Sequence, residues 1–193
     1  MKAVDIKQLK KYGWAKLLKG ALSDDFCDKL VLKMNEQKWE DARINGGGTQ
    51  IIDKSVRDCK RIMQIDHELS DHITNIIDEF LPENFNDCKK VGLNPMFRFL
   101  KYGIGNYFKR HYDLRYTDKD NNISLITVQI YLNDDFEGGE TVFYDGDYYG
   151  DRIYTYVPKK GDIILFDQIF EHEGSKIKEG IKYCVRTEAM YKE

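Results

Sequence analysis

The chain has 193 residues, which is enough for one domain with a sizeable hydrophobic core. Its formal net charge of -3 gives no signature of general nucleic-acid binding. No apolar run is long enough to span a membrane, and the N-terminus lacks the apolar region of a signal peptide, so we expect a cytoplasmic protein that does not enter a membrane.

The four cysteines are Cys27, Cys59, Cys88 and Cys184, and no two of them stand at zinc-ligand spacing. In a cytoplasmic protein we expect reduced thiols. We interpret Cys27 and Cys184 as small core residues, while the sequence assigns no role to Cys59 or Cys88.

Residues 1–20 are predicted to form a short helix followed by a strand around 13–18. Ser23 has the side chain of a helix N-cap, and apolar residues recur every four positions after it, which predicts a helix from Asp24 to about Gln37. Residues 40–58 contain three consecutive glycines and no periodicity. They are predicted to form a mobile loop or a loose hairpin.

Residues 61–65 are predicted as a short strand, and residues 67–80 as a second helix that ends before Pro82. His67 and His72 lie on this helix, but a spacing of five residues does not place them on one face. We therefore interpret both as surface or cap residues and not as ligands.

After Pro95 the sequence changes to short segments separated by turn signals. Helices followed by about seven or eight strands predict a mainly β protein with supporting helices (α+β), as a β-sandwich or jelly roll. We expect one domain over residues 1–193, with helical support to about residue 92 and a β core from about residue 93. Strands are predicted at residues 96–102, 107–113, 124–132, 140–144, 152–157, 162–166 and 182–191.

The predicted strand at 124–133 has two different faces. One face is aliphatic and would pack on a layer of helices; it carries Ile126, Val128, Ile130 and Leu132. The opposite face is mixed and carries Leu125, Thr127, Gln129, Tyr131 and Asn133. If the mixed face points into a barrel, its polar groups need a polar occupant. The alternative is an edge strand whose polar side chains lie in water.

The last predicted strand places Lys182, Cys184 and Arg186 on one face. Two cations on one face of a central strand are costly to bury without an anion. Either this is an edge strand in water, or an anionic ligand lies against it.

His111 and Asp113 point to the same side if their segment is extended. Together with a second histidine they would form the two-histidine, one-carboxylate triad of non-haem Fe(II) oxygenases. Of the four histidines, His172 has the most suitable local setting for the third ligand. For the triplet by itself, a strand with a polar solvent face is the alternative.

Several motifs occur in an order and at intervals that resemble one family. The chain is similar to the 2-oxoglutarate- and Fe(II)-dependent dioxygenases, and within them to the prolyl 4-hydroxylase-like branch, over about residues 93–191. The motifs are Phe97–Tyr102 with Gly105, Phe108 and His111-Tyr112-Asp113; Tyr131-Leu132-Asn133 with Phe136–Phe143; Pro158–Asp162 before a strand that ends in Phe166; and His172-Glu173-Gly174 with Gly180-Ile181-Lys182.

The resemblance implies a double-stranded β-helix fold, in agreement with the jelly roll. It implies that His111, Asp113 and His172 are catalytic residues that hold Fe(II), with 2-oxoglutarate as cosubstrate and ascorbate as a reductant. The implied reaction decarboxylates 2-oxoglutarate to succinate and hydroxylates a substrate C–H bond.

The distal carboxylate of 2-oxoglutarate would need a buried cation and a hydroxyl group. Lys182 is at the usual family position, ten residues after His172, and Tyr131 on the mixed face can add a neutral hydrogen bond. Arg186, further along the same face, is the second candidate anchor. Tyr102 corresponds to a family tyrosine that lines the pocket.

The substrate implied by the resemblance is a protein or peptide, with hydroxylation of a peptidyl proline. Four tyrosines could pack on a pyrrolidine ring, although such tyrosines are more often plain sheet surface: Tyr148, Tyr149, Tyr154 and Tyr156. We expect the loop at 40–58 and the acidic segment at 144–151 to flank the site and to become ordered on substrate binding. The sequence does not predict the oligomeric state.

Two alternatives remain. Oxidative demethylation of nucleic acid would favour a basic groove around the metal. The seven acids of residues 134–151 argue against it, whereas Arg98, Arg110 and Arg115 keep it open. The second alternative is a non-catalytic metal-binding interaction module on the same fold. The presence of Asp113 argues against that module and against a halogenase.

Overall fold

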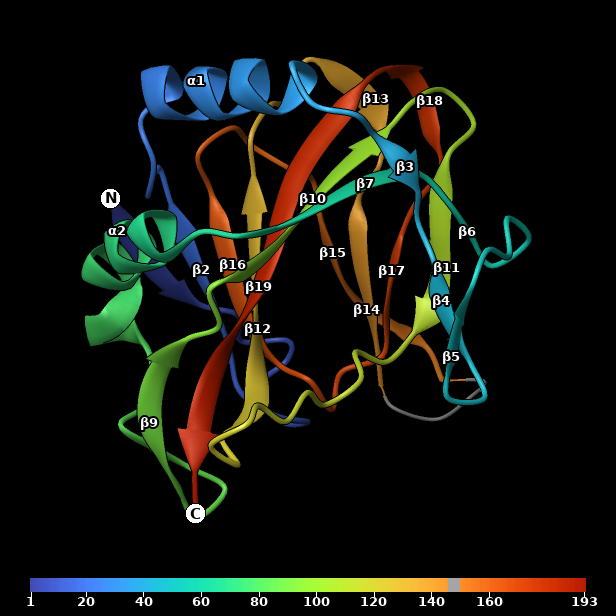
Figure 1. Ribbon diagram of the computed structural model, residues 1–193. Helices are drawn as coiled ribbons and strands as arrows, with labels where there is room; N and C mark the ends of the chain where they lie inside the picture. Colours follow the sequence, from blue (N-terminus) through green and yellow to red (C-terminus); the bar gives the residue numbers. More distant parts are fainter. Residues whose placement is uncertain (146–149) are drawn as a thin grey trace.

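A computed structural model describes residues 1–145 and 150–193. Two antiparallel β-sheets face each other, and the two α-helices lie on the outer side of the larger sheet (Figure 1). The arrangement is that of a double-stranded β-helix, so the predicted mainly β fold with supporting helices is confirmed.

The helices form where their sequence signals predict them. Helix α1 spans Asp24–Asn35, and the Ser23 side chain accepts a hydrogen bond from the backbone of Phe26. Helix α2 spans His67–Ile77, is capped by Asp66 and continues as the 3-10 helix η1, Asp78–Phe80. None of the described helices has the length and apolar character needed to cross a membrane.

The larger sheet has a continuous path of strands and a short branch. Its strands, in spatial order, are β1 (Lys2–Asp5), β2 (Ala15–Lys19), β16 (Ile163–Asp167), β12 (Ile123–Tyr131), β19 (Lys182–Lys192), β10 (Met96–Tyr102), β7 (Lys60–Ile65) and β3 (Glu40–Asp41). Strand β19 also pairs with β9 (Cys88–Leu93), which pairs with β8 (Asn84–Phe85). Strand β19 is therefore central, between β12 and β10.

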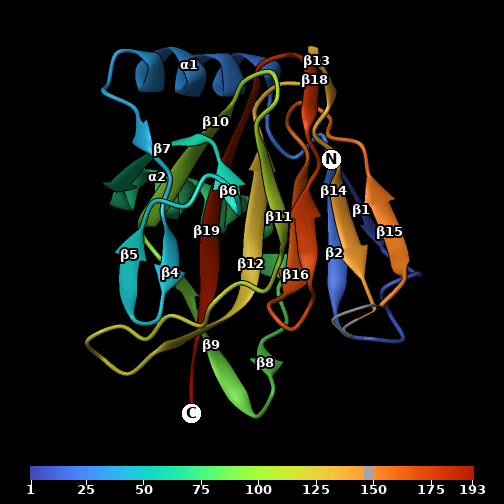
Figure 2. The same cartoon turned by 90° about the vertical axis from the view of Figure 1, so that its right-hand side faces the viewer.

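The smaller sheet carries the two histidines of the expected triad. Its spatial order is β15 (Arg152–Tyr156), β14 (Thr141–Tyr144), β17 (His172–Gly174), β11 (Tyr107–His111) and β6 (Arg57–Asp58). Two further two-stranded sheets are the pair β13 (Phe136–Gly138) and β18 (Ile177–Gly180), and the hairpin β4 (Ile44–Gly46) and β5 (Thr49–Ile51). The β4–β5 hairpin stands at the edge of the molecule (Figures 1 and 2).

The N-terminal segment differs from the prediction. The expected helix is absent, because residues 2–5 form β1 and pair with β2, which extends the larger sheet by one strand. Ile6 and Leu9 follow it and are buried. Here sheet pairing and burial prevail over the helix propensity of the local sequence. Residues 1–92 also supply β2, β3, β7 and β9 to the larger sheet and β6 to the smaller one, and are thus more than helical support.

The two faces of β12 have the roles that their alternation predicts. The aliphatic face packs with α1 and α2 in the core outside the larger sheet, through Ile126, Val128, Ile130 and Leu132. Leu125 joins the same core because the register shifts between Ser124 and Ile126. On the other face Thr127 and Tyr131 are buried between the sheets. The mixed face therefore points into the interior.

The four cysteines are buried free thiols. Cys27 and Cys88 lie in the core under the helices, while Cys59 and Cys184 lie in the core between the sheets. The expectation for Cys27 and Cys184 is confirmed. His67 and His72 are exposed on α2, as expected.

Candidate active site

His111, Asp113 and His172 converge, as the sequence predicts. His111 ends β11 and lies directly opposite His172, the first residue of β17. Asp113 follows two residues after the end of β11, so its position depends on the turn beyond the strand and not on strand alternation alone. Each residue offers one ligand atom, and these three atoms lie within 4.8 Å of one another.

Two backbone carbonyl groups orient the histidine rings. His111 Nδ1 donates to the carbonyl oxygen of Lys109 (2.7 Å), and His172 Nδ1 donates to that of Phe170 (3.1 Å). Each Nε2 then carries a lone pair and faces Asp113, at 3.7 Å for His111 and 3.8 Å for His172. Burial lowers the pKa of both rings, which favours the neutral form that binds metals.

Asp113 is held as a carboxylate. Burial by itself would raise its pKa, but the Arg186 guanidinium and the two histidines hold the pKa below its usual value. Thr127 Oγ1 donates to Asp113 Oδ2 (2.6 Å). Arg186 Nη1 lies 2.6 Å from Asp113 Oδ1, yet among the described residues Oδ1 accepts no well-directed hydrogen bond. This buried oxygen therefore keeps a lone pair for a metal.

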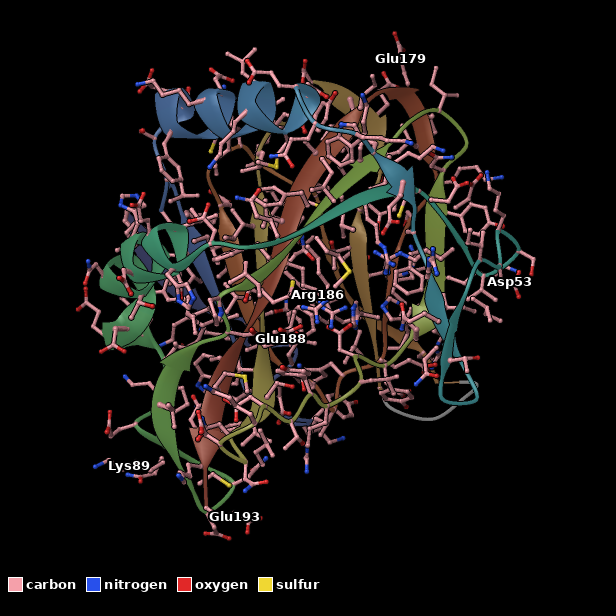
Figure 3. The ribbon with its side chains drawn as sticks, in the orientation of Figure 1. Asp53, Lys89, Glu179, Arg186, Glu188 and Glu193 are labelled. Atoms are coloured by element: carbon pink, nitrogen blue, oxygen red, sulfur yellow. The ribbon has the colours of Figure 1, made fainter. Side chains whose placement is uncertain are left out.

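Arg186 belongs to a buried charge network that the sequence did not reveal. Glu188 is 1% exposed, and its Oε1 lies 3.3 Å from Arg186 Nη2 and 2.6 Å from Arg98 Nη1. Asn94 donates to the other oxygen of Glu188 (2.9 Å). Figure 3 shows Arg186 and Glu188 in the middle of the molecule, far from the labelled residues at its edge. The sequence does contain a signal for this network: Glu188 follows Arg186 by two residues, so the two side chains share one face of the strand.

Lys182 lines an inner pocket and is 5% exposed. Its Nζ donates to the carbonyl oxygen of Gly139 (2.6 Å) and lies 5.4 Å and 5.7 Å from the ring centroids of Tyr131 and Tyr102. Burial lowers the pKa of Lys182. No carboxylate of the described residues lies within ion-pair distance of it, so an anionic ligand would stabilise its charge.

The predicted tyrosines have different positions around this pocket. Tyr102 lies in its wall. Tyr131 lies behind the wall, where its hydroxyl shares a 2.7 Å hydrogen bond with Thr141 Oγ1. Thr141 lines the pocket, and sequence reasoning missed it. The wall also contains His111, His172, Gln129 and Arg186, so the inner pocket joins Lys182 to the histidine pair.

These residues fit both groups that the sequence implies. Two neutral imidazoles and a carboxylate suit a divalent iron. A buried lysine without a carboxylate partner suits one end of a dicarboxylate whose other end reaches the metal. The fit rests on Asp113 Oδ1, which accepts no well-directed hydrogen bond from the described residues, and on Lys182, whose charge has no carboxylate partner among them.

The family comparison agrees with this geometry. Residues 97–187 match the family described as the 2OG-Fe(II) oxygenase superfamily. The similarity to that superfamily covers slightly less than half of the chain. The superfamily's name states the two cofactors, Fe(II) and 2-oxoglutarate, and the matched segment contains all three triad residues together with Lys182.

The proteins similar to this chain include prolyl hydroxylases. A protein described as "Probable prolyl 4-hydroxylase 6" from Arabidopsis thaliana is 27% identical over 191 residues, which cover 85% of this chain and 62% of the relative. This chain thus spans less than two thirds of that relative's length.

Two solved structures share the fold. The viral collagen prolyl hydroxylase from Paramecium Bursaria Chlorella virus-1, in complex with 2-oxoglutarate, has a TM-score of 0.67 and 23% identity, over 94% of this chain and 97% of that one. A prolyl hydroxylase from Trichoplax adhaerens, in complex with a hypoxia inducible factor oxygen degradation domain peptide, has a TM-score of 0.68 and 17% identity, over 94% and 85%. At these identities the likeness shows the fold.

The predicted flanking segments and tyrosines are only partly where we expected them. A wider outer cavity lies beside His111 and Asp113, and the segment at 40–58 supplies much of its wall. Within the segment at 144–151, residues 146–149, which include Tyr148 and Tyr149, lie outside the described residues. Tyr156 is a core residue that donates to Asp162 Oδ2 (2.7 Å), and Tyr154 packs on Phe143; neither lines the inner or the outer cavity.

Proposed function

We propose that this chain is a 2-oxoglutarate- and Fe(II)-dependent dioxygenase that hydroxylates a C–H bond of a peptide, at a proline. One observation carries the proposal: both histidines of the two-histidine, one-carboxylate triad line the same pocket as a buried lysine without a carboxylate partner among the described residues. The superfamily match supports the chemistry, and the prolyl hydroxylase relatives support proline as the substrate residue.

His111, Asp113 and His172 are the residues that would hold the iron. When bound, the iron and 2-oxoglutarate supply oxidative decarboxylation to succinate and carbon dioxide, coupled to hydroxylation of the substrate. The chain's own contribution is orientation. The Lys109 and Phe170 carbonyls fix the histidine tautomers.

Lys182 is the proposed anchor for the distal carboxylate of 2-oxoglutarate, with the Tyr131–Thr141 hydroxyl pair beside it and Tyr102 in the pocket wall. Its position supports this role because its Nζ donates to a neutral carbonyl group and has no carboxylate partner among the described residues. Arg186 is the weaker candidate, since Asp113 and Glu188 already pair with it.

Three further points belong to the proposal. Residues 1–193 act as one oxygenase domain, because β7 and β3 from the N-terminal part continue the sheet that β10 and β19 form. Ascorbate is the reductant that keeps the iron ferrous. The chain works in the cytoplasm, where a reducing environment suits four buried free thiols.

The test is succinate release with Fe(II), 2-oxoglutarate and ascorbate, over a panel of proline-containing peptides, free amino acids and methylated oligonucleotides. We expect proline peptides to stimulate release and to gain the mass of one oxygen atom. His172→Ala should abolish both signals. Stimulation by methylated oligonucleotides alone would contradict the proline assignment, and binding of iron without any turnover would favour a non-catalytic module.

A further inference from the structure

The outer cavity has a wall of unusual charge. It encloses about 360 Å³ between the β4–β5 hairpin and residues 112–114, next to His111 and Asp113. Asp113 is the only acidic side chain among its described lining residues. Five cations surround that one acid: Arg43, Arg57, Arg61, Arg98 and Arg186.

Three of these arginines already have anionic partners. Arg98 and Arg186 share Glu188. The Nε of Arg61 lies 2.9 Å from Glu40 Oε1. Their charges are therefore largely compensated within the protein.

Arg57 is the exception that points to a ligand. It is 8% exposed, and no carboxylate of the described residues lies within ion-pair distance of it. Its Nε donates to Cys59 Sγ (3.4 Å), and its guanidinium lies 4.4 Å from the centroid of the Phe108 ring. Both contacts are with neutral groups. A buried guanidinium without an anion is costly, so an anion in the cavity would stabilise it.

Arg43 adds a second uncompensated charge to the wall of the same cavity. It lies just before β4, at the base of the hairpin, and is exposed, with no carboxylate of the described residues within ion-pair distance. Two arginines without anionic partners therefore face one cavity beside the candidate metal ligands. Arginine suits planar, bidentate recognition of a carboxylate.

We propose that the outer cavity binds a carboxylate of the substrate, so that the hydroxylated residue lies next to an Asp or Glu of an acidic peptide. Arg43 and Arg57 are the specificity-determining residues. This inference rests on the proposed hydroxylase function and adds the substrate class to it. The cosubstrate does not meet the same need, because Lys182 is the proposed partner of its distal carboxylate in the inner pocket.

The surroundings of the cavity favour a peptide over a nucleic acid. Ile44, Tyr112 and Leu114 line it, and Tyr112 and Leu114 are exposed large side chains that can contact apolar residues of a peptide. A nucleic-acid site would continue as a basic track along the backbone. Outside the cavity the nearby lysines are instead paired: Lys54 and Lys60 lie 3.5 Å and 2.7 Å from Asp41.

The test measures binding, so that it does not depend on turnover. Three fluorescein-labelled peptides carry one central proline flanked on both sides by Asp, by Asn or by Lys, and a labelled oligothymidylate is the nucleic-acid probe. Zn(II) replaces Fe(II), with 2-oxoglutarate present, and anisotropy gives Kd. We expect the Asp peptide to bind about tenfold or more tightly than the Asn peptide, and the Lys peptide to bind most weakly.

The variants assign the preference to residues. Arg43→Gln, at an exposed position, and Arg57→Met should each bring the ratio of the Asn-peptide Kd to the Asp-peptide Kd toward one. Arg57→Lys, which keeps the charge, should retain part of the preference. Lys178→Gln removes a charge from an exposed position on β18 and should leave the ratio unchanged. Kd for 2-oxoglutarate should stay unchanged in Arg43→Gln.

Several results would overturn the inference. They are equal binding of the Asp and Asn peptides, binding of neither, or a preference that survives Arg43→Gln and Arg57→Met. Oligothymidylate binding that is tighter than peptide binding and is lost in the same variants would assign the arginines to phosphate. Arg57 lines both cavities, so weaker 2-oxoglutarate binding in Arg57→Met with an unchanged peptide preference would assign it to the cosubstrate.

The two proposals fail in different ways. If the Asp peptide binds preferentially but no peptide is hydroxylated, the carboxylate site stands and the hydroxylase function falls. If proline peptides are hydroxylated without regard to flanking charge, the function stands and the carboxylate site falls.

Discussion

Arg186 Nη1 and Asp113 Oδ1 lie 2.6 Å apart, so a guanidinium touches the only carboxylate of the candidate metal site. The same arginine also contacts Glu188, which is 1% exposed. Arg186 thus connects the metal ligands to the charge network on β19. Its removal should mainly lower protein stability and displace Asp113. The effect on cosubstrate binding should be smaller.

Arg186→Met should destabilise the protein, because it leaves Glu188 with Arg98 as its single remaining cation. Breaking a buried ion pair costs about 3–5 kcal/mol. Because Arg186 is partly exposed, we expect the free energy of unfolding to fall by an amount at the lower end of this range. Urea unfolding of the metal-free protein measures it. If Arg186→Met abolishes 2-oxoglutarate binding while Lys182→Met does not, the cosubstrate anchor has been assigned to the wrong residue.

Thr127→Val tests the group that holds the other oxygen of Asp113. The Thr127 hydroxyl donates to Asp113 Oδ2 (2.6 Å), and both residues are buried. Loss of such a supporting hydrogen bond typically weakens metal binding by about 10–100-fold, and valine keeps the shape of the side chain. Competition with a fluorescent chelator measures Fe(II) or Zn(II) affinity. Thr155→Val, on an exposed position of β15, is the matched control and should bind metal as the wild type does.

Lys182→Met removes the ammonium group and keeps an apolar side chain of similar length. The affinity for 2-oxoglutarate should fall by at least roughly a hundredfold, because breaking a buried charge pair costs about 3–5 kcal/mol. Metal affinity should persist, since the triad is unchanged. Tyr131→Phe should cost less, about 1–2 kcal/mol, through its hydrogen bond with Thr141. Calorimetry in the presence of Zn(II) measures both, and an unchanged affinity in Lys182→Met would remove it as the anchor.

The sequence predicted the elements whose signals are local. The Ser23 cap and its apolar spacing defined α1, and β10 was predicted with the bounds that the structure shows. The triad followed from residue types and from family motifs. The short strands β1 and β17 were missed, because pairing with neighbouring strands fixes them and not their own pattern.

The polar residues of the site that the sequence did not predict were missed for the same reason. Thr141 lines the inner pocket only because β14 pairs with β17, and Glu188 contacts Arg98 only because β10 and β19 are neighbours. Arg57 belongs to a segment without periodicity, which the sequence described only as a loop or loose hairpin. Side chains that meet across strands cannot be matched until the strand order is known.

The β4–β5 hairpin should become ordered when a peptide binds. Its strands pair with each other and with no other described strand, while residues at its base line the outer cavity. Few contacts hold it, so its amides should exchange rapidly in the free protein. Hydrogen exchange with and without the Asp-flanked peptide should show slower exchange over residues 44–51, with β12 unchanged as the control. Equal exchange in both states would contradict a role in substrate binding.

Stability should fall at alkaline pH through Cys27. This thiol is fully buried in the core under α1, and burial raises its pKa from 9.0 to about 11. Between these values the unfolded chain loses the thiol proton while the folded protein keeps it. The folded state then binds more protons, so the free energy of unfolding decreases as pH rises from 9 to about 11, and this contribution is fully present only below pH 9.

Cys27→Ala isolates that contribution. Alanine removes the titrating group, so the variant should be less stable at pH 8, where a small cavity remains, and should lose less stability than the wild type between pH 9 and 11. Urea unfolding at several pH values measures both slopes. Ile73→Val is the matched control, because it opens a small cavity in the same core without removing a titrating group, and we expect the wild-type slope. Parallel slopes for wild type and Cys27→Ala would show that other groups, such as buried tyrosines, govern alkaline unfolding.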